Sequence, residues 1–195
     1  IIFLALPSST IIENIKYFSN YITSQQIVVN LSKGILSNGQ TIIEYLTKEL
    51  KSNNLISLKG PSFAVEIMNH AETVLTLGYS KEKQKEIIFE IFSNTCISLE
   101  STKDINGVEI LGVIKNIYAI LLGIVDEKFI SPNSQFMILS KVFNEIRILN
   151  NIFKGDTETI FLACGLGDIC LTSFNELSRN RSLGKQIGKG LYKPR

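Results

Sequence analysis

The sequence predicts an α/β domain with a mostly parallel sheet, residues 1–102, followed by an all-helical domain, residues 103–195. Three features support this fold class. The chain has 195 residues, 45% of them hydrophobic, which is enough for one good-sized domain or two small ones with buried cores. Before residue 102, short apolar runs alternate with segments of helical periodicity, as in parallel-sheet proteins. After it, the strand signals fade and apolar residues recur at helical spacing.

Five strands are expected in the first domain. Residues 1–6 are apolar on both faces, which is typical of a buried strand, and Ser9 or Thr10 can cap the helix that follows. In the segment 59–64, Pro61 should lie just inside a helix start, where free N–H groups can hold an anion. We expect strands at residues 1–6, 27–31, 55–58, 72–79 and 96–100, and helices at 11–21, 41–51, 81–92 and, as a short helix, after 64.

Composition excludes several classes of function. A net charge of +2 without a Lys/Arg-rich block argues against nucleic acid as a partner. Cys96, Cys164 and Cys170 form no CxxC pair, and His70 is the single histidine, so we expect no metal site and free thiols in a reducing cytoplasm. The longest apolar run, residues 117–125, is about half of what a bilayer span needs, so we expect no membrane span.

Dinucleotide-binding sheets begin with a glycine-rich turn, and this sequence contains no such turn after a strand. No GxGxxG follows a strand, and the nearest approach, Gly165-Leu166-Gly167, falls in the helical half. If the first domain is such a sheet, we expect at least one βαβ unit of ~30 residues upstream of Ile1. Discrimination between NAD and NADP would then depend on residues outside this chain.

The second domain contains a lysine in an apolar helical segment. Lys115 shares its helix face with Gly112 and Ala119, and Gly123 continues the stripe. Each interior glycine costs about 1 kcal/mol relative to alanine, so the glycines indicate close approach of a neighbour. Apolar surroundings should lower the pKa of Lys115 and suit it to proton transfer, although a snorkelling structural lysine fits the same pattern. We expect helices at residues 104–125, 133–153, 157–162, 168–177 and 182–189.

Two further segments of the helical half could bind a ligand. Asp168 follows two glycines, which predicts a turn and a helix N-cap, and Thr172 shares its face at i+4. A capping aspartate beside an incidental threonine is the structural alternative. Arg179 offers a planar fork for a phosphate, with Ser178 and Asn180 as neutral donors beside it. Its structural alternative is a solvated basic turn.

Strand ends of the first domain supply the remaining candidates. Lys33 follows the second predicted strand, and the segment 59–64 follows the third. Open α/β sheets bind ligands at the carboxyl ends of their strands, so both should reach the same crevice. A tight turn and an exposed lysine are the alternatives.

Taken together and in order, these segments resemble the bacterial-type NAD(P)-dependent glycerol-3-phosphate dehydrogenase family. The resemblance implies a Rossmann-type parallel sheet, present here as its second half, followed by an all-α domain of the 6-phosphogluconate dehydrogenase-like kind. The matching stretches are LPSS (6–9), SKGI (32–35), GPSFAVE (60–66), GVEILGVIKNIYAILLGI (107–124), GLGDICLT (165–172) and SRNRSLG (178–184).

The resemblance also implies a reaction and a set of site residues. The reaction is the interconversion of dihydroxyacetone phosphate and sn-glycerol 3-phosphate with NAD or NADP as cofactor, supplying glycerol phosphate for phospholipid synthesis. Lys115 matches the proton donor and acceptor on the C2 oxygen, and Asp168 the carboxylate beside it. The implied cofactor contacts are Lys33, Ala64 and Arg179. The implied substrate contacts are Lys33, Gly60, Ser62, Lys115, Asp168, Thr172, Ser178, Arg179 and Asn180.

Two departures and two alternatives accompany the resemblance. His70-Ala71-Glu72 stands where the family has a glycine–proline pair, and the tail, residues 191–195, differs from the family's helix-and-strand continuation. One alternative is another β-hydroxyacid or 6-phosphogluconate-type dehydrogenase, whose substrate needs a carboxylate site. The other is an inactive remnant that serves as an interaction module. The expected partner is a small-molecule substrate, and a homodimer is one candidate assembly.

Overall fold

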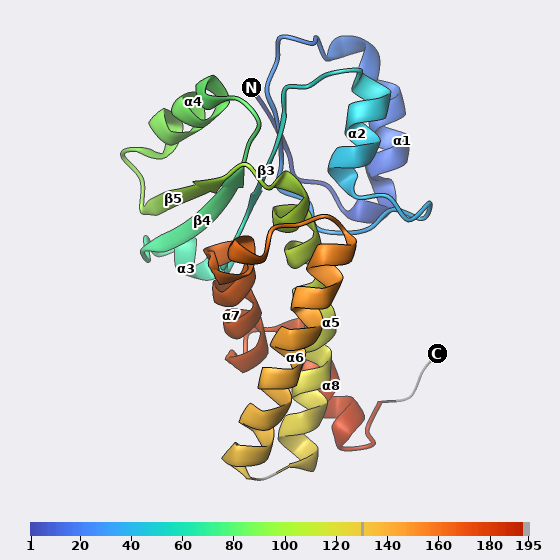
Figure 1. Cartoon of the computed structure of the whole chain (residues 1–195), viewed down its shortest axis with the longest axis vertical. Helices are drawn as coiled ribbons and strands as arrows, with labels where there is room; N and C mark the ends of the chain where they lie inside the picture. The colour runs from blue at the N-terminus through green and yellow to red at the C-terminus, as the bar shows by residue number, and fades with distance from the viewer. Residues whose placement is uncertain (130, 193–195) are drawn as a thin grey trace.

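A computed structural model describes residues 1–129 and 131–192, so the last three residues of the predicted helical domain and of the atypical tail lie outside the described part. A twisted sheet with helices on both faces stands at one end of the molecule, and a group of long helices forms the other end (Figure 1). The chain passes from sheet to helices between the end of the last strand at Thr102 and the helix that begins at Ile105.

All five predicted strands are present in one sheet, in the order β1-β2-β3-β4-β5. β1 pairs with β2, β2 with β3, and β4 with β5, all in parallel, whereas β3 and β4 are antiparallel. The predicted mostly parallel sheet is therefore confirmed, with one reversal after β3. The strands are β1 (Ile2–Leu4), β2 (Val28–Asn30), β3 (Leu55–Lys59), β4 (Thr73–Gly78) and β5 (Ile97–Thr102).

Alternate residues of the central strands enter different cores because strand side chains point to opposite faces. Val28 packs with α1 and α2 on one face, and Val29 packs with α4 on the other. Thr41 starts α2 with a capping box, in which its hydroxyl accepts from the Glu44 N–H and the Glu44 carboxylate accepts from the Thr41 N–H. The helices of this domain are α1 (Ile11–Phe18), α2 (Ile42–Leu50), α3 (Ala64–Met68) and α4 (Glu82–Phe92).

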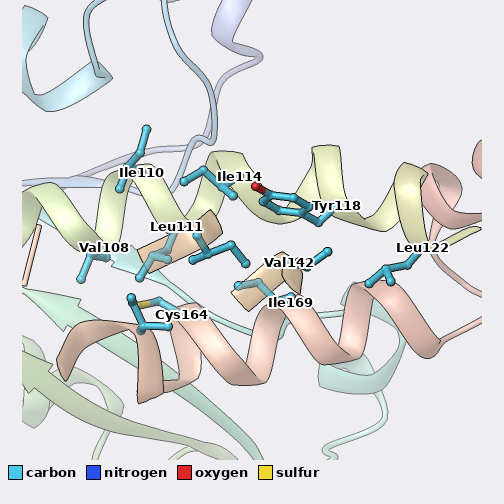
Figure 2. Close-up of a cluster of buried hydrophobic side chains, with 11 residues drawn as sticks. Val108, Ile110, Leu111, Ile114, Tyr118, Leu122, Val142, Cys164 and Ile169 are labelled. Atoms are coloured by element: carbon cyan, nitrogen blue, oxygen red, sulfur yellow. The ribbon is translucent and has the colours of Figure 1, made fainter. Parts of the chain in front are cut away.

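The second core surrounds α5 (Ile105–Lys128). Figure 2 shows Leu111 and Tyr118 of this helix gathered with Val142, Cys164 and Ile169 from the segments that pack on it. The other helical segments are α6 (Pro132–Ile152), a 3-10 turn (Thr157–Phe161), a π-helical turn (Ala163–Gly167), α7 (Asp168–Phe174) and α8 (Arg179–Gly188).

Close packing at the predicted glycine stripe is confirmed. A Cβ atom on Gly123 would lie 2.4 Å from the carbonyl oxygen of Arg181 and 3.1 Å from the Cα of Gly184, so α5 and α8 cross almost in backbone contact. A Cβ on Gly112 would lie 3.3 Å from the Cδ of Lys59 on β3. The glycines thus admit one neighbouring helix and one strand side chain, and α5 joins the two domains.

Within the described residues, α5 is also the one helix that is long and apolar enough to cross a bilayer. The uninterrupted apolar run is short, as the sequence indicated, but the whole helix has the length and the mean hydropathy of a membrane-spanning helix. Its most apolar window is 67% buried within the protein, which is the environment of a core helix.

Three predictions about helix starts are wrong, although α7 does begin at Asp168 as expected: the cap of α7, the start of α8 and the place of Pro61. Asp168 is not the N-cap of α7, because a π-helical turn that contains both glycines leads directly into the helix. α8 begins at Arg179, earlier than the predicted 182, because the hydroxyl of Ser178 caps it by accepting from the Arg181 N–H. Pro61 precedes α3 by three residues, so it does not lie just inside a helix start as expected.

Candidate active site

Lys115 and Asp168 meet at the contact between α5 and α7. The Lys115 Nζ donates to Asp168 Oδ1 at 2.5 Å and to the hydroxyl of Thr172 at 3.2 Å. Thr172 lies one turn after Asp168, so its hydroxyl also reaches Asp168 Oδ1, at 3.4 Å. Asp168 is 1% exposed and Lys115 8% exposed. The carboxylate that resembled a helix cap is therefore a buried partner of an ammonium group.

A second lysine reaches the same carboxylate from the sheet. The Nζ of Lys33, three residues after the end of β2, lies 3.1 Å from Asp168 Oδ2. The two oxygens of Asp168 thus bind two cations that come from different domains. We refer to Lys33, Lys115 and Asp168 as the lysine–aspartate centre.

The charge balance of this centre controls the proton affinity of Lys115. Burial lowers the pKa of Lys115, because the ammonium form loses hydration, and the positive charge of Lys33 acts in the same direction, whereas Asp168 opposes the shift; the net result is a pKa of about 8. The predicted direction of this pKa shift agrees with the structure. A lysine with such a pKa can give and take a proton near neutral pH.

An open cavity of about 510 Å³ begins at Lys115. Asn180 donates from its amide to the Asn116 side-chain oxygen at 2.8 Å, so α8 is fixed to α5 across the cavity wall. The residues that line this cavity are Phe63, Lys115, Asn116, Thr172, Leu177, Ser178, Arg179, Asn180 and Leu183. Five residues from the predicted set therefore share one cavity, whose lining contains both polar and apolar side chains.

Two arginines at the start of α8 have different environments. Arg181 is buried and forms ion pairs with Asp126 and Glu176, so its charge is compensated within the protein. Arg179 is exposed at the cavity and makes no ion pair within residues 1–129 and 131–192. Its guanidinium is the one of the two that can bind an external anion.

The loop after β3 lies next to this centre, and Phe63 of this loop lines the cavity, whereas Gly60 and Ser62 do not. Gly60 is buried with φ +154°, and a Cβ atom there would lie 2.9 Å from the Val74 carbonyl oxygen, so glycine is needed where β4 passes close by. The Ser62 hydroxyl donates to the Gly60 carbonyl at 3.1 Å, and Ala64, the first residue of α3, is exposed. A Cβ atom on Gly167, the residue before Asp168, would lie 3.6 Å from the Cγ of Pro61, so this loop passes close to the start of α7.

Sequence reasoning missed a second buried ion pair and four cavity residues, which are Phe63, Asn116, Leu177 and Leu183. Lys59 and Glu109 are 2% and 3% exposed, and their charged atoms lie 3.0 Å apart. The acidic residue in an apolar helix was a usable signal, because a carboxylate in such a place needs a buried cation. Phe63 and Asn116 fall inside the quoted motifs, but no sequence signal places them at the cavity.

No group of three or more His, Cys, Asp or Glu side chains that could hold a metal ion occurs in the described parts of the chain. The cations of the site are lysines and an arginine. Proton transfer and anion binding are the chemistry that this set of side chains can support.

Comparison with known proteins adds an independent line of evidence. The N-terminal model of the NAD-dependent glycerol-3-phosphate dehydrogenase family matches residues 1–85, and its C-terminal model matches residues 104–193. Together the two matches cover most of the chain. A glycerol-3-phosphate dehydrogenase (NAD(P)+) of Methanothermobacter thermautotrophicus is 32% identical over 190 residues, which are 96% of this chain and 58% of that protein.

Other relatives and a solved structure agree. A chloroplastic glycerol-3-phosphate dehydrogenase (NAD(+)) of Arabidopsis thaliana is 33% identical over 94% of this chain and 44% of its own length. The crystal structure of a glycerol-3-phosphate dehydrogenase from Coxiella burnetii matches with a TM-score of 0.89 and 27% identity, covering 96% of this chain and 58% of that one. The chain therefore spans about half the length of the relatives that it matches.

Proposed function

The chain belongs to the NAD-dependent glycerol-3-phosphate dehydrogenase family, and we propose that it contributes the catalytic centre of an enzyme that interconverts dihydroxyacetone phosphate and sn-glycerol 3-phosphate. The observation that supports this most directly is the lysine–aspartate centre. A lysine whose pKa is lowered to about 8 stands beside an open cavity, and its carboxylate partner joins both domains.

Lys115 acts as the acid in ketone reduction and as the base in the reverse reaction. NAD(P)H supplies the hydride when it is bound. As the new C2–H bond forms, the electron pair of the carbonyl double bond moves onto oxygen, and Lys115 Nζ gives that oxygen a proton. Lys115 is left as a neutral amine and regains its proton from solvent. In alcohol oxidation the same amine removes the hydroxyl proton.

Asp168 keeps both lysines in place and offsets their charge. Its Oδ1 accepts from Lys115 and its Oδ2 from Lys33, so each ammonium has a fixed direction. The positive charge of Lys33 also favours the oxyanion that develops on the substrate. Thr172 accepts from Lys115 and limits the rotation of its Nζ.

Arg179 binds the phosphate group of the substrate. Its guanidinium can give two parallel hydrogen bonds to phosphate oxygens, and no carboxylate in the described chain competes for it. Asn180 and Ser178, its neighbours in sequence, line the same cavity. Gly60 and Ser62 lie on the loop after β3, beside the lysine–aspartate centre.

The donors present fit the nicotinamide end of a dinucleotide. Lys33 and Arg179 are cations that can pair with phosphate or ribose oxygens, and Ala64 adds no bulk where the ring approaches. Lys33 follows β2 and Ala64 follows β3, so both lie beyond the carboxyl ends of parallel strands, where open α/β sheets bind nucleotides. The described residues contain no glycine-rich fingerprint, so these side chains account for only part of the binding of NAD or NADP.

Cellular context follows from the same proposal. Cys96, Cys164 and Cys170 are free thiols, which suits a reducing compartment, and we assign the enzyme to the cytoplasm, where it would supply glycerol phosphate for phospholipid synthesis. A homodimer remains the proposed assembly for the full-length protein.

The test is oxidation of NADH and NADPH by the purified full-length protein with dihydroxyacetone phosphate. We expect turnover with this ketone, none with unphosphorylated 3-oxo acids and no oxidation of 6-phosphogluconate. Activity confined to a carboxylate substrate would assign the protein to the related dehydrogenases. Absence of turnover with every substrate, in a folded protein that binds the nucleotide, would favour the inactive remnant.

A further inference from the structure

A buried polar cluster lies behind the lysine–aspartate centre. Glu109 of α5 accepts at one oxygen, Oε1, from the Ser57 hydroxyl at 2.5 Å and from the Asn30 amide at 2.8 Å. The Lys59 Nζ lies 3.0 Å from the same oxygen and donates to the Asn30 carbonyl at 2.8 Å. Asn30 and Ser57 are completely buried, as are nearly all atoms of the ion pair.

This cluster connects the three elements that present the proposed site residues. Asn30 ends β2, Lys59 ends β3, and Glu109 lies on α5. Lys33 follows β2, the loop of Gly60 follows β3, and Lys115 lies on α5 six positions after Glu109. A buried ion pair of this kind seldom adds stability over apolar residues of the same size, so its function is more often to fix one arrangement.

Asn30 transmits the position of α5 to Lys33. Its side-chain oxygen accepts from the Ser32 N–H at 3.0 Å, and its amide donates to the Ser32 carbonyl at 3.2 Å as well as to Glu109. The backbone of Ser32 is thereby held from both sides. Lys33 is the next residue, so a shift of Glu109 moves the starting point of its side chain.

We propose that Lys59 and Glu109 form a positioning pair, which acts through Asn30 to set the place of Lys33 relative to Lys115. The inference rests on the proposed function of the lysine–aspartate centre. Lys59 and Glu109 touch neither substrate nor cofactor and transfer no proton. Their effect is to hold two cations from different domains on one carboxylate.

The experiment replaces both charges at once. The double variant Lys59→Met/Glu109→Leu leaves no unpaired charge in the core, so it should fold, with a melting temperature near that of the wild type. It should still lower kcat/KM for dihydroxyacetone phosphate at least ~10-fold, because small displacements in a catalytic centre are costly. The matched control Lys59→Met/Glu109→Gln keeps the acceptor oxygen for Asn30 and Ser57 but lacks the bond from Lys59 to the Asn30 carbonyl, so it should recover only part of that loss.

A second background separates positioning from a general effect on structure. In a Lys33→Met protein, the same apolar pair should cause almost no further loss, because the residue that it positions is gone. An equal loss in both backgrounds, or no loss in either, overturns the inference. If the apolar pair proves too unstable to assay, Asn30→Ala cuts the link to Ser32 without breaking the ion pair, and the same two backgrounds apply.

A structural readout keeps the inference separate from the reaction. A crystal structure of the apolar-pair variant should show the Lys33 Nζ displaced from Asp168 Oδ2. Retention of the present 3.1 Å contact refutes the positioning pair even if the enzyme is active. Failure of the wild type to reduce dihydroxyacetone phosphate instead refutes the proposed function and leaves this measurement to decide the inference by itself.

Discussion

Replacing Lys115 by methionine removes one ammonium group from the lysine–aspartate centre and keeps the length of the side chain. Asp168 retains Lys33 at 3.1 Å after this change, so its carboxylate is not left unpaired. The lost charged hydrogen bond is worth about 1.5–3 kcal/mol. Part of that is offset, because the protein no longer buries an ammonium group. The fold should therefore survive with a melting temperature lowered by a few degrees.

The effect on turnover should be much larger than the effect on stability. A positioned general acid contributes typically ~10²–10⁴-fold to the rate. We expect Lys115→Met to lower kcat at least ~10²-fold, which corresponds to about 2.7 kcal/mol of transition-state stabilisation. Nucleotide affinity should stay near that of the wild type, because Lys115 lies on the cavity side and the nucleotide is held mainly by the sheet domain.

The assay is steady-state turnover with titration of NADH in the full-length protein. Lys115→Arg is the matched control, because arginine keeps the positive charge but does not release its proton at working pH. It should be nearly as inactive as Lys115→Met. Near-wild-type kcat in either variant refutes the reasoning, since Lys115 would then be a structural residue and Lys33 the next candidate for the proton donor.

Three further outcomes follow from the same geometry. Arg179→Lys should lower kcat/KM for dihydroxyacetone phosphate at least ~10-fold but hardly change the rate with unphosphorylated dihydroxyacetone, and equal losses on both would exclude Arg179 as the phosphate ligand. Because the pKa of Lys115 is lowered to about 8, ketone reduction should slow as pH rises through about 8 and alcohol oxidation should accelerate. Initial rates in both directions check this, and a common trend contradicts it. Gly123→Ala should cost about 1–3 kcal/mol of unfolding free energy, because its Cβ would lie 2.4 Å from the Arg181 carbonyl oxygen. An unchanged melting temperature would mean that α8 can move aside freely.

Local patterns predicted the elements well because each depends on residues that are neighbours in sequence. The alternation of apolar runs and helical periods indicated all five strands of the sheet, and the glycine stripe around Lys115 indicated a closely packed helix. The lowered pKa of Lys115 followed from a charged residue in an apolar helix. The catalytic and binding roles assigned to the site residues all remain predictions, and Gly60, Ser62 and Ala64 also lie outside the cavity lining.

Long-range contacts decided what the local patterns left open. The sequence allowed Asp168 to cap a helix or to pair with a distant cation. In the structure it pairs with Lys115 and Lys33, which are 53 and 135 positions away in sequence. A lysine at a strand end is normally exposed, and no sequence pattern near Lys59 predicts that its side chain is completely buried. That burial depends on Glu109, which is 50 positions later, and on the space left by Gly112.

The sequence by itself determined the order and type of the elements, the family and the position of Lys115 on the glycine stripe of an apolar helix. Only the tertiary structure decided that β4 runs antiparallel to β3, that Asp168 binds lysines from both domains, and that Arg179 rather than Arg181 is free for an anion. The physical reason is the range of the interactions. Periodicity and capping act within a few residues, whereas buried charges are satisfied by whichever partner the folded chain brings within about 3 Å.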